Sequence, residues 1–169
     1  MESHAVIRRR HVLAAAAVAL GLIVAFVLWW FQPQKLFINH TVNEAAPVTA
    51  VGDAPARLVA TGRLHSGEHH TTGTVQLLEP GNGRALLRLV DLRTSNGPVV
   101  HVLLSATDGN ASNGGIDRAA HIDLGGLKGN LGSQNYPVPA DVDVSRFHSV
   151  IIWCSRFHVA FGAAALAPV

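Results

Sequence analysis

The fold is decided by the stretch SVIIWCSRFHVAF, residues 149–161, in which two apolar runs flank the polar pair Ser155-Arg156. Side chains alternate between the two faces of a β-strand. Both faces of 149–154 are mainly apolar, with His148, Val150, Ile152 and Cys154 on one and Ser149, Ile151 and Trp153 on the other. A strand that is apolar on both faces is buried on both sides. The pattern therefore predicts a central strand, joined by a tight turn to a partner strand at 157–161.

Cys154 is the one cysteine of the chain and ends the predicted strand beside the turn. This position lies between core and surface, where a thiol could be reached, and the sequence leaves open whether Cys154 is exposed. A single cysteine cannot form an internal disulfide, and in an exported domain it suggests intermolecular pairing, a ligand role or a reactive thiol. The alternative is a small buried hydrophobic residue, which cysteine often is.

Short apolar runs separated by turn residues extend through the rest of the C-terminal part. The runs at 73–78 and 84–90 have the period of strands and flank PGNG at 80–83, which is a strong hairpin signal. Residues 99–105 predict another buried strand, and no segment after the N-terminal apolar block has a convincing helical period. We therefore expect an all-β domain over 58–167, an antiparallel β-sandwich or barrel-like domain.

An apolar block of twenty residues, 12–31, contains no charged side chain and ends in Trp29-Trp30-Phe31. Three arginines, Arg8-Arg9-Arg10, precede it. About 20 helical residues span the hydrocarbon core of a membrane, and flanking arginines mark the cytoplasmic side. We expect 1–11 to be cytoplasmic, 12–31 to be a single transmembrane helix in the cell membrane, and the chain from residue 32 onward to be extracytoplasmic.

Two other structures would give a similar apolar block. A cleaved signal peptide has a shorter apolar region, about 7–15 residues, followed by a small-x-small cleavage site. A buried core helix is the second alternative, although Arg flanks and an apolar surface all round favour lipid. After the block, Pro33, Pro47 and Pro55 interrupt residues 32–57 and predict a partly extended extracytoplasmic linker.

Charge and motifs exclude several classes of function. The net charge is +2, and without the three N-terminal arginines the remainder is about neutral, so the pI of 9.2 does not indicate nucleic-acid binding. There is no Gly-x-Ser-x-Gly elbow of a hydrolase. A single cysteine excludes zinc fingers and covalent c-type haem. The scarcity of Lys beside Arg, with many Ala and Val, is typical of a GC-rich bacterial genome.

Histidines in the predicted β domain raise the question of a metal or haem site. Cys154-x-x-x-His158 has a spacing found in copper-binding loops, but such sites need two His, one Cys and a weak axial ligand, often Met. The only methionine is Met1, on the other side of the predicted membrane helix. Haem requires an axial ligand such as a Cys thiolate or His and an apolar pocket. Copper is therefore the less favoured cofactor and haem a candidate, with Cys154 and His158 as the candidate ligands.

Several segments together resemble a known family. They are EHHTTG at 68–73 with Gly62 before it, TSNGP at 94–98, LKGNLGSQNYPVP at 127–139 and SVIIWCSRFHVAFGAA at 149–164. In this order they resemble the DM-thirteen domain, described as an electron-transfer domain, over about residues 58–167. Leu64 and Leu92 stand where the family pattern has Phe, and both are apolar replacements that preserve a core.

The resemblance implies a β-sandwich-like domain with a redox role centred on Cys154. It implies that this thiol acts bare or as a ligand to a group such as haem. His158 occupies a position where the family has no fixed histidine, which argues against a Cys-x-x-x-His copper site. The partner would then be a redox protein, in addition to the membrane that holds residues 12–31.

A second class of function stays open beside the redox role. A cofactor-free β domain on a membrane stalk is suited to binding or scaffolding at the cell surface, with a cell-surface protein as partner. In the Gly-rich block, polar side chains can hydrogen-bond loop backbone and hold a rigid lip. These side chains are Asn130, Gln134, Asn135 and Tyr136.

Overall fold

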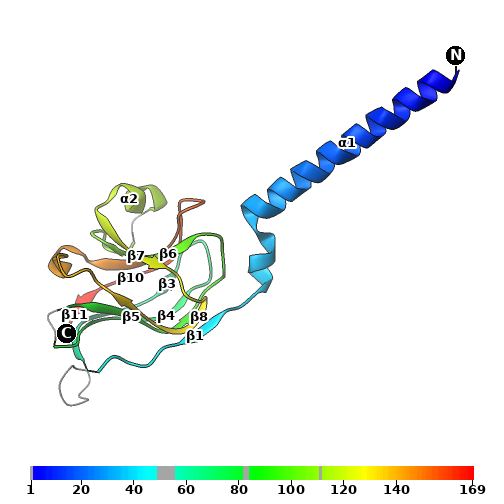
Figure 1. The fold of residues 1–169 in the computed structure, drawn as a ribbon. Coiled ribbons are helices and arrows are strands. Elements are labelled where there is room, and N and C mark those ends of the chain that lie inside the picture. Colours follow the sequence, from blue (N-terminus) through cyan, green and yellow to red (C-terminus); the bar gives the residue numbers. More distant parts are fainter. Residues whose placement is uncertain (1, 49–55, 82–83, 111) are drawn as a thin grey trace. The chain divides into compact units, whose positions relative to one another are not determined.

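The computed structural model describes residues 2–48, 56–81, 84–110 and 112–169. The chain divides into two compact units, one ending at Gln34 and one beginning at Lys35. The first contains the helix α1 (Glu2–Phe31), and the short 3-10 helix η1 (Pro33–Phe37) begins in the first unit and ends in the second. The second holds the strands shown in Figure 1.

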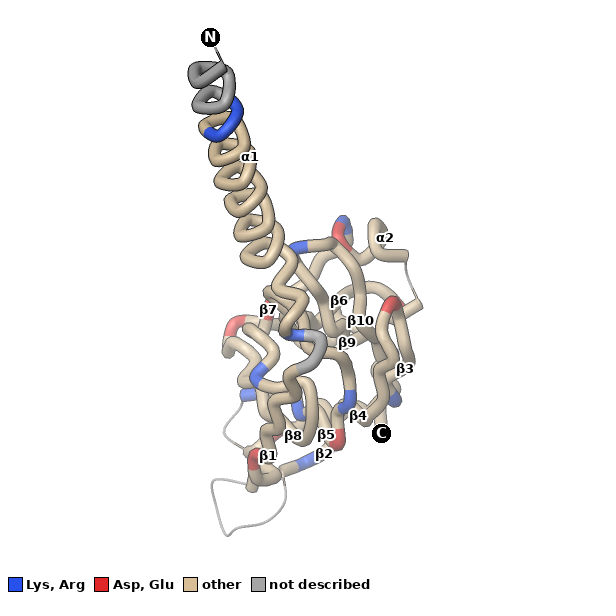
Figure 2. Tube along the Cα trace, turned by 90° about the vertical axis from the view of Figure 1, so that its right-hand side faces the viewer, with Lys and Arg blue, Asp and Glu red and all other residues tan. Residues whose placement is uncertain are grey.

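Helix α1 has the length and composition of a membrane span. The most apolar part of its segment Arg9–Phe31 has a mean hydropathy of 2.7, and none of that part is buried within the protein. Arg9 and Arg10 stand at the start of this segment and no further charge follows, as Figure 2 shows along the helix. An N-terminal apolar helix of this kind fits a single-pass anchor and equally a signal sequence.

The second unit is a β-rich domain of two sheets, which confirms the expectation of a β domain after an apolar helix. One sheet has six strands in the order β1-β8-β5-β4-β2-β11 and the other has five in the order β3-β10-β9-β6-β7. The strands are β1 (Thr41–Asn43), β2 (Arg57–Arg63), β3 (His65–Ser66), β4 (Thr72–Glu79), β5 (Leu86–Arg93), β6 (Val100–Ser105), β7 (His121–Gly126), β8 (Leu131–Pro137), β9 (Ser149–Cys154), β10 (Val159–Ala165) and β11 (Ala167–Pro168).

The predicted hairpin and central strand are both present. β4 and β5 pair antiparallel, with Leu77 opposite Leu87, and their connection includes positions 82–83, which lie outside the described residues. β9 lies between β6 and β10, and each of its six residues is buried. The strand is buried on both sides because each of its two apolar faces packs in a separate hydrophobic cluster.

The main core joins the two sheets. It contains side chains from both, among them Val75, Leu87 and Leu89 of the six-stranded sheet and Val102 and Ile152 of the five-stranded sheet. A smaller cluster lies on the opposite face of the five-stranded sheet, under the one short helix of the domain. That cluster consists of Leu103, Ile116, Ile151, Trp153, Ala160 and Ala163.

Two features differ from what the sequence suggested. The first is the short helix α2 (Asn113–Arg118), in a region where no helical period is visible. The helix has six residues, which are too few for a periodic pattern, and two of them are glycines. It forms because the Oγ of Ser112 accepts the N–H of Gly115 as an N-cap, and because Ile116 inserts into the smaller cluster.

The second difference concerns strand direction. The domain was expected to be antiparallel, but β1 pairs with β8 in parallel, Thr41 opposite Leu131 and Asn43 opposite Ser133. Residues 32–57 were expected to be a linker, and β1 lies within that range. A three-residue strand whose partner is about ninety residues away leaves no local signal in the sequence. Positions 49–55, including Pro55, lie outside the described residues.

Candidate functional site around Cys154

Cys154 is the last residue of β9 and is buried in the main core. It pairs with Val100 of β6 and with Val159 of β10, and 0% of its surface is exposed. From the sequence we expected a strand end between core and surface, and the exposure of the thiol was left open. The structure buries the thiol, because Cys154 shares the face of Val150 and Ile152, which points between the two sheets.

A four-residue loop, Asn96–Val99, covers the sulfur. The Sγ of Cys154 donates a hydrogen bond to the carbonyl oxygen of Pro98 at 3.2 Å. The next carbonyl, that of Val99, accepts the N–H of Ser155 at 3.0 Å. Two successive carbonyls of the loop are therefore fixed to the end of β9. A reagent can reach the sulfur only if these contacts open.

The loop is held tightly and is strained at one residue. Val99 has φ = 54°, in the left-handed region that β-branched residues rarely adopt, which costs about 1–3 kcal/mol. Gly97 has no room for a side chain, since a Cβ there would lie 2.7 Å from Cζ of Phe161. The side chain of Asn96 accepts the N–H of Gly97 and donates to the carbonyl oxygen of Ile38. The strain is thus maintained by packing on both sides of the loop.

The structure does not bring His158, the second candidate ligand, to the sulfur. Nδ1 of His158 lies 3.1 Å from Oδ1 of Asp117 in α2, and its ring meets the ring of Trp153 edge-on at 6.2 Å. Trp153 belongs to the cluster under α2, whereas Cys154 belongs to the core between the sheets. The side chains of His158 and Cys154 therefore lie on opposite sides of the five-stranded sheet. Among the described residues, no group of three or more His, Cys, Asp or Glu could hold a metal ion.

Haem does not fit the arrangement around Cys154. An axial ligand needs open space beside the ligating atom for the iron and the macrocycle. Here the sulfur has no exposed surface, and it donates its hydrogen bond to the carbonyl oxygen of Pro98. The iron would have to replace that carbonyl, so we derive no step through haem.

Beside the loop lies the Gly-rich segment 127–135, which we call the lip. Hydrogen bonds of the side chains of Asn130, Gln134 and Tyr136 hold loop backbone there, as expected. Oε1 of Gln134 accepts the N–H groups of Lys128 and Gly129 and the hydroxyl of Tyr136, and its Nε2 donates to the carbonyl oxygen of Gly129 at 2.7 Å. Nδ2 of Asn130 donates to the carbonyl oxygen of Thr94 at 3.0 Å. The expectation that these side chains hold loop backbone is confirmed. Burial raises the pKa of Tyr136 to about 12, although the N–H donated by Lys128 opposes the shift.

Residues just before β4 support the same end of the core. The ring of His69 lies against the ring of Phe161, with 3.8 Å between centroids, and burial lowers the pKa of His69 despite the nearby Glu68. Oγ1 of Thr71 donates to the carbonyl oxygen of Phe161 at 2.8 Å and bonds the hydroxyl of Thr94. Reasoning from sequence did not assign these roles to the EHHTTG segment. The signal that could have drawn attention to these residues is that EHHTTG is one of the segments that resemble the family.

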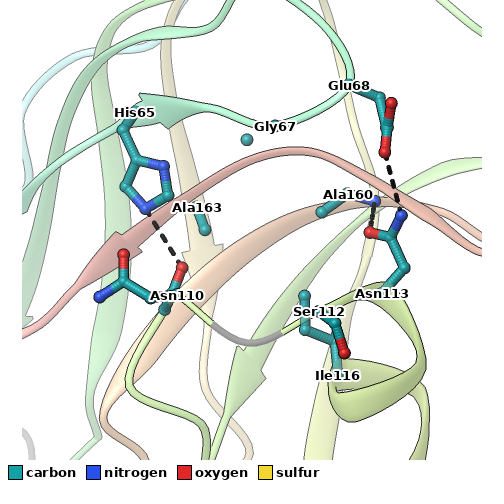
Figure 3. A pocket seen from close by; sticks show the side chains of 11 residues that line it. His65, Gly67, Glu68, Asn110, Ser112, Asn113, Ile116, Ala160 and Ala163 are labelled. Carbon is teal, nitrogen blue, oxygen red and sulfur yellow. Dashed lines mark hydrogen bonds between the residues drawn. The ribbon is translucent and has the colours of Figure 1, made fainter.

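A cavity of about 380 Å³ lies on the opposite side of the five-stranded sheet, beside α2. Figure 3 shows Asn113 bridging two of its walls, since Nδ2 donates to Glu68 and Oδ1 accepts the N–H of Ala160. Nε2 of His65 lies 3.1 Å from the carbonyl oxygen of Gly109. The polar groups of this cavity largely satisfy one another, and Cys154 does not line it.

The geometry defines a class of protein: a two-sheet β domain with a single thiol buried at one end, after an N-terminal apolar helix. The family described as "Electron transfer DM13" matches residues 63–166. This match covers more than half of the chain, and the chain belongs to that family. Comparison with curated proteins and comparison with solved structures gave no match.

Proposed function

We propose that this protein is a single-pass membrane protein whose extracytoplasmic domain transfers electrons through the thiol of Cys154, acting without a cofactor. The observation that carries the proposal is the membership of an electron-transfer family whose matched range, 63–166, contains Cys154 as its one thiol. For the anchor, the support is the apolar segment Arg9–Phe31 with arginines at its start.

Few side chains of the matched range can exchange electrons. Without a bound group, the readily oxidised candidates are Cys154, Trp153 and Tyr136, one residue of each type. Tyr136 is held in the Gln134 network, and Trp153 packs under α2. The thiol is the group whose reversible chemistry is best suited to repeated turnover. It also lies under the Asn96–Val99 loop, which is strained at Val99.

The step we propose is thiol–disulfide exchange with a partner protein that carries a disulfide. When the Asn96–Val99 loop opens, the Cys154 thiol releases its proton to water, and the thiolate attacks one sulfur of the partner's disulfide. That S–S bond breaks as a new one forms to Cys154, and the partner's other sulfur leaves as a thiolate, which takes a proton from water. Cys154 thereby gives one electron to the sulfur that leaves. A second thiol, from a small thiol such as glutathione or from Cys154 of another copy of the chain, then attacks the Cys154 sulfur of the mixed disulfide, releases the partner's remaining sulfur as a thiolate and supplies the second electron.

The test uses the full chain in lipid nanodiscs, incubated with glutathione buffers of graded redox potential and trapped by acid. Mass spectrometry should find a glutathione adduct on Cys154 whose fraction follows the potential, and none in Cys154→Ser. Trp153→Phe, a neighbouring change that keeps the thiol, should retain the adduct. If the thiol reacts only as fast as the whole domain unfolds, the proposal is wrong. A Soret band after incubation with haem, lost in Cys154→Ser, would instead support the haem alternative.

A specific observation favours the second candidate, a cofactor-free binding module at the cell surface. The sulfur of Cys154 is fully buried and hydrogen-bonded in the closed structure, as expected of a packing residue. In that case Cys154→Ala should leave the function of the protein in the cell intact. Changes in the 127–135 lip that keep the domain folded should then abolish partner binding.

A further inference from the structure

The end of the β domain at which β9 finishes carries exposed apolar side chains. From residue 35 onward, three of the exposed large hydrophobic residues that the structure describes lie in segments that meet there. They are Ile38, Val99 and Phe157, with 55%, 42% and 40% of their surface exposed. We call these three residues the Val99 patch.

Hydrogen bonds hold the segments of the Val99 patch together. The carbonyl oxygen of Ile38 accepts Nδ2 of Asn96 at 3.2 Å, three residues before Val99. The carbonyl oxygen of Val99 accepts the N–H of Ser155 at 3.0 Å, two residues before Phe157. The three apolar side chains therefore come from three neighbouring backbone segments. Single exposed hydrophobic residues need no explanation, but a group of them marks an interaction surface.

Basic residues accompany the Val99 patch. Lys35 lies in the same segment as Ile38, and it lines a cavity of about 340 Å³ together with Val99. Arg156 directly precedes Phe157 in the turn between β9 and β10. The carboxylates near these segments are each held by a neighbour: Glu68 accepts a hydrogen bond from Asn113, Asp117 lies 3.1 Å from Nδ1 of His158, and Asp123 lies 2.7 Å from Nδ1 of His101. Apolar side chains with flanking cations suit the headgroup region of an anionic membrane.

The short length of chain between α1 and the Val99 patch favours the membrane as the surface that the patch contacts. Six residues separate Phe31, the end of α1, from Ile38. Even fully extended they reach about 25 Å at most, and η1 shortens them further. A membrane that holds α1 thus stays within reach of the Val99 patch. For a tethered domain the effective concentration of lipid is high, so a weak surface is sufficient for contact.

We propose that the Val99 patch rests on the lipid surface in which α1 is anchored. The inference relies on the anchor of the proposed function and is independent of the redox role of Cys154. It places the Asn96–Val99 loop close to the membrane surface.

Spin labels in the full chain test this directly. The background is Cys154→Ser, whose hydroxyl can still donate to Pro98. A nitroxide is attached at Phe157→Cys and, as a matched control, at Ser145→Cys, an exposed site in η2 (Val144–Arg146) before the opposite end of β9. The chain is placed in nanodiscs of phosphatidylethanolamine and phosphatidylglycerol. Power saturation then compares access of oxygen, which concentrates in lipid, with access of a water-soluble nickel chelate.

The label at 157 should favour oxygen over the nickel chelate, and the label at 145 should favour the chelate. Adding Phe157→Asp to a label at Val99→Cys should shift that label toward water. The inference is overturned if the label at 157 is as accessible to the chelate as the label at 145. It is also overturned if the label at 157 is shielded from both reagents, which would indicate contact with protein, such as a second copy of the chain.

Two further measurements separate the possible failures. Circular dichroism and thermal unfolding of each labelled variant must match the wild-type protein. As a readout that needs no substitution, hydrogen exchange of residues 155–158 in the wild-type chain should slow as the phosphatidylglycerol content of the discs rises. If α1 does not insert into the discs, the anchor of the proposed function fails. If α1 inserts and the patch stays in water, only the present inference fails.

Discussion

The sulfur of Cys154 lies 3.2 Å from the carbonyl oxygen of Pro98 and donates a hydrogen bond to it. A thiol must lose its hydrogen before it can attack a disulfide or bind a metal. A backbone carbonyl cannot take that hydrogen. The closed loop therefore protects the sulfur chemically as well as sterically, and the reactivity of Cys154 depends on how often Asn96–Val99 opens.

Gly97→Ala should make the thiol more reactive. The added methyl group would lie 2.7 Å from Cζ of Phe161, so the loop must shift away from the core. We expect alkylation of Cys154 by a small maleimide to accelerate about tenfold, which corresponds to ~1.4 kcal/mol in the opening equilibrium. Gly126→Ala is the control, because its nearest neighbour, the carbonyl oxygen of Val100, lies at 3.9 Å. Equal rates in the two variants would show that the loop does not govern access.

The buried Gln134 should be essential for stability. Its side chain is 0% exposed and serves the N–H groups of Lys128 and Gly129 as well as the hydroxyl of Tyr136. Gln134→Leu would leave the N–H of Gly129 and the hydroxyl of Tyr136 without their acceptor, whereas the N–H of Lys128 keeps Oη of Tyr136 at 3.1 Å. The cost is about 1–3 kcal/mol for each group that stays unsatisfied. We expect a loss of about 2–5 kcal/mol in the free energy of unfolding, measured by urea denaturation with circular dichroism.

Tyr136→Phe is the matched comparison for Gln134→Leu. It removes the hydroxyl that donates to Gln134 and accepts the N–H of Lys128, but it leaves Oε1 of Gln134 in place as acceptor for both N–H groups. The loss should therefore be smaller, about 1 kcal/mol. If both variants lose the same amount, the lip is held by something other than the Gln134 side chain.

The β-rich architecture was predictable because its signals are local. The two apolar faces of 149–154 indicated the central strand β9, and PGNG at 80–83 indicated the β4–β5 hairpin. The parallel pair of β1 and β8 was not predictable, since no short-range pattern links residues so far apart. Helix α2 depends on the N-cap Ser112 and one buried side chain, Ile116, rather than on periodicity.

The candidate site was predictable in identity but not in accessibility. The resemblance drew attention to Cys154, and alternation correctly grouped it with Val150 and Ile152. What the sequence could not indicate is that the Asn96–Val99 loop folds over the end of β9, because that depends on a tertiary contact. The same limit applies to His158, whose partner Asp117 lies in a helix without a sequence signal.

The phenol of Tyr136 should make the domain less stable in strong base. Burial raises the pKa of Tyr136 to about 12 from an ordinary value of 10. The folded state therefore keeps the proton over a range in which the unfolded state loses it. This stabilisation is fully present below pH 10 and is lost as the pH rises toward 12. The loss approaches ~2.7 kcal/mol at 1.36 kcal/mol per unit.

A titration of absorbance at 295 nm measures this pKa directly, because Tyr136 is the one tyrosine of the chain. The free energy of unfolding of the wild-type protein should fall between pH 10 and pH 12 by more than that of Tyr136→Phe. An absorbance midpoint near pH 10 would show that the phenol is accessible to water and that the lip is open in solution.

Glu44 should fasten the β1 segment to the lip in a pH-dependent way. Its Oε1 accepts Nζ of Lys128 at 2.7 Å and its Oε2 accepts the N–H of Asn135 at 2.6 Å. The hydrogen bond from Lys128 is the main cause that lowers the pKa of Glu44, and partial burial opposes it. The folded state binds the proton more weakly than the unfolded state does. The stabilisation is therefore present above pH 4.5 and is lost as the pH falls through the lowered pKa.

Glu44→Gln removes that charge while preserving the shape of the side chain. Because the pair with Lys128 is partly exposed, with side-chain exposures of 39% and 33%, the loss at pH 7 should not exceed about 1 kcal/mol. The difference from wild type should vanish near pH 3, where Glu44 itself is neutral. The control is Glu79→Gln, which breaks a more exposed pair with Arg57 within the same sheet and should change the free energy of unfolding less. A difference that persists unchanged at pH 3 would mean that the carboxylate of Glu44 is not what holds β1 in place.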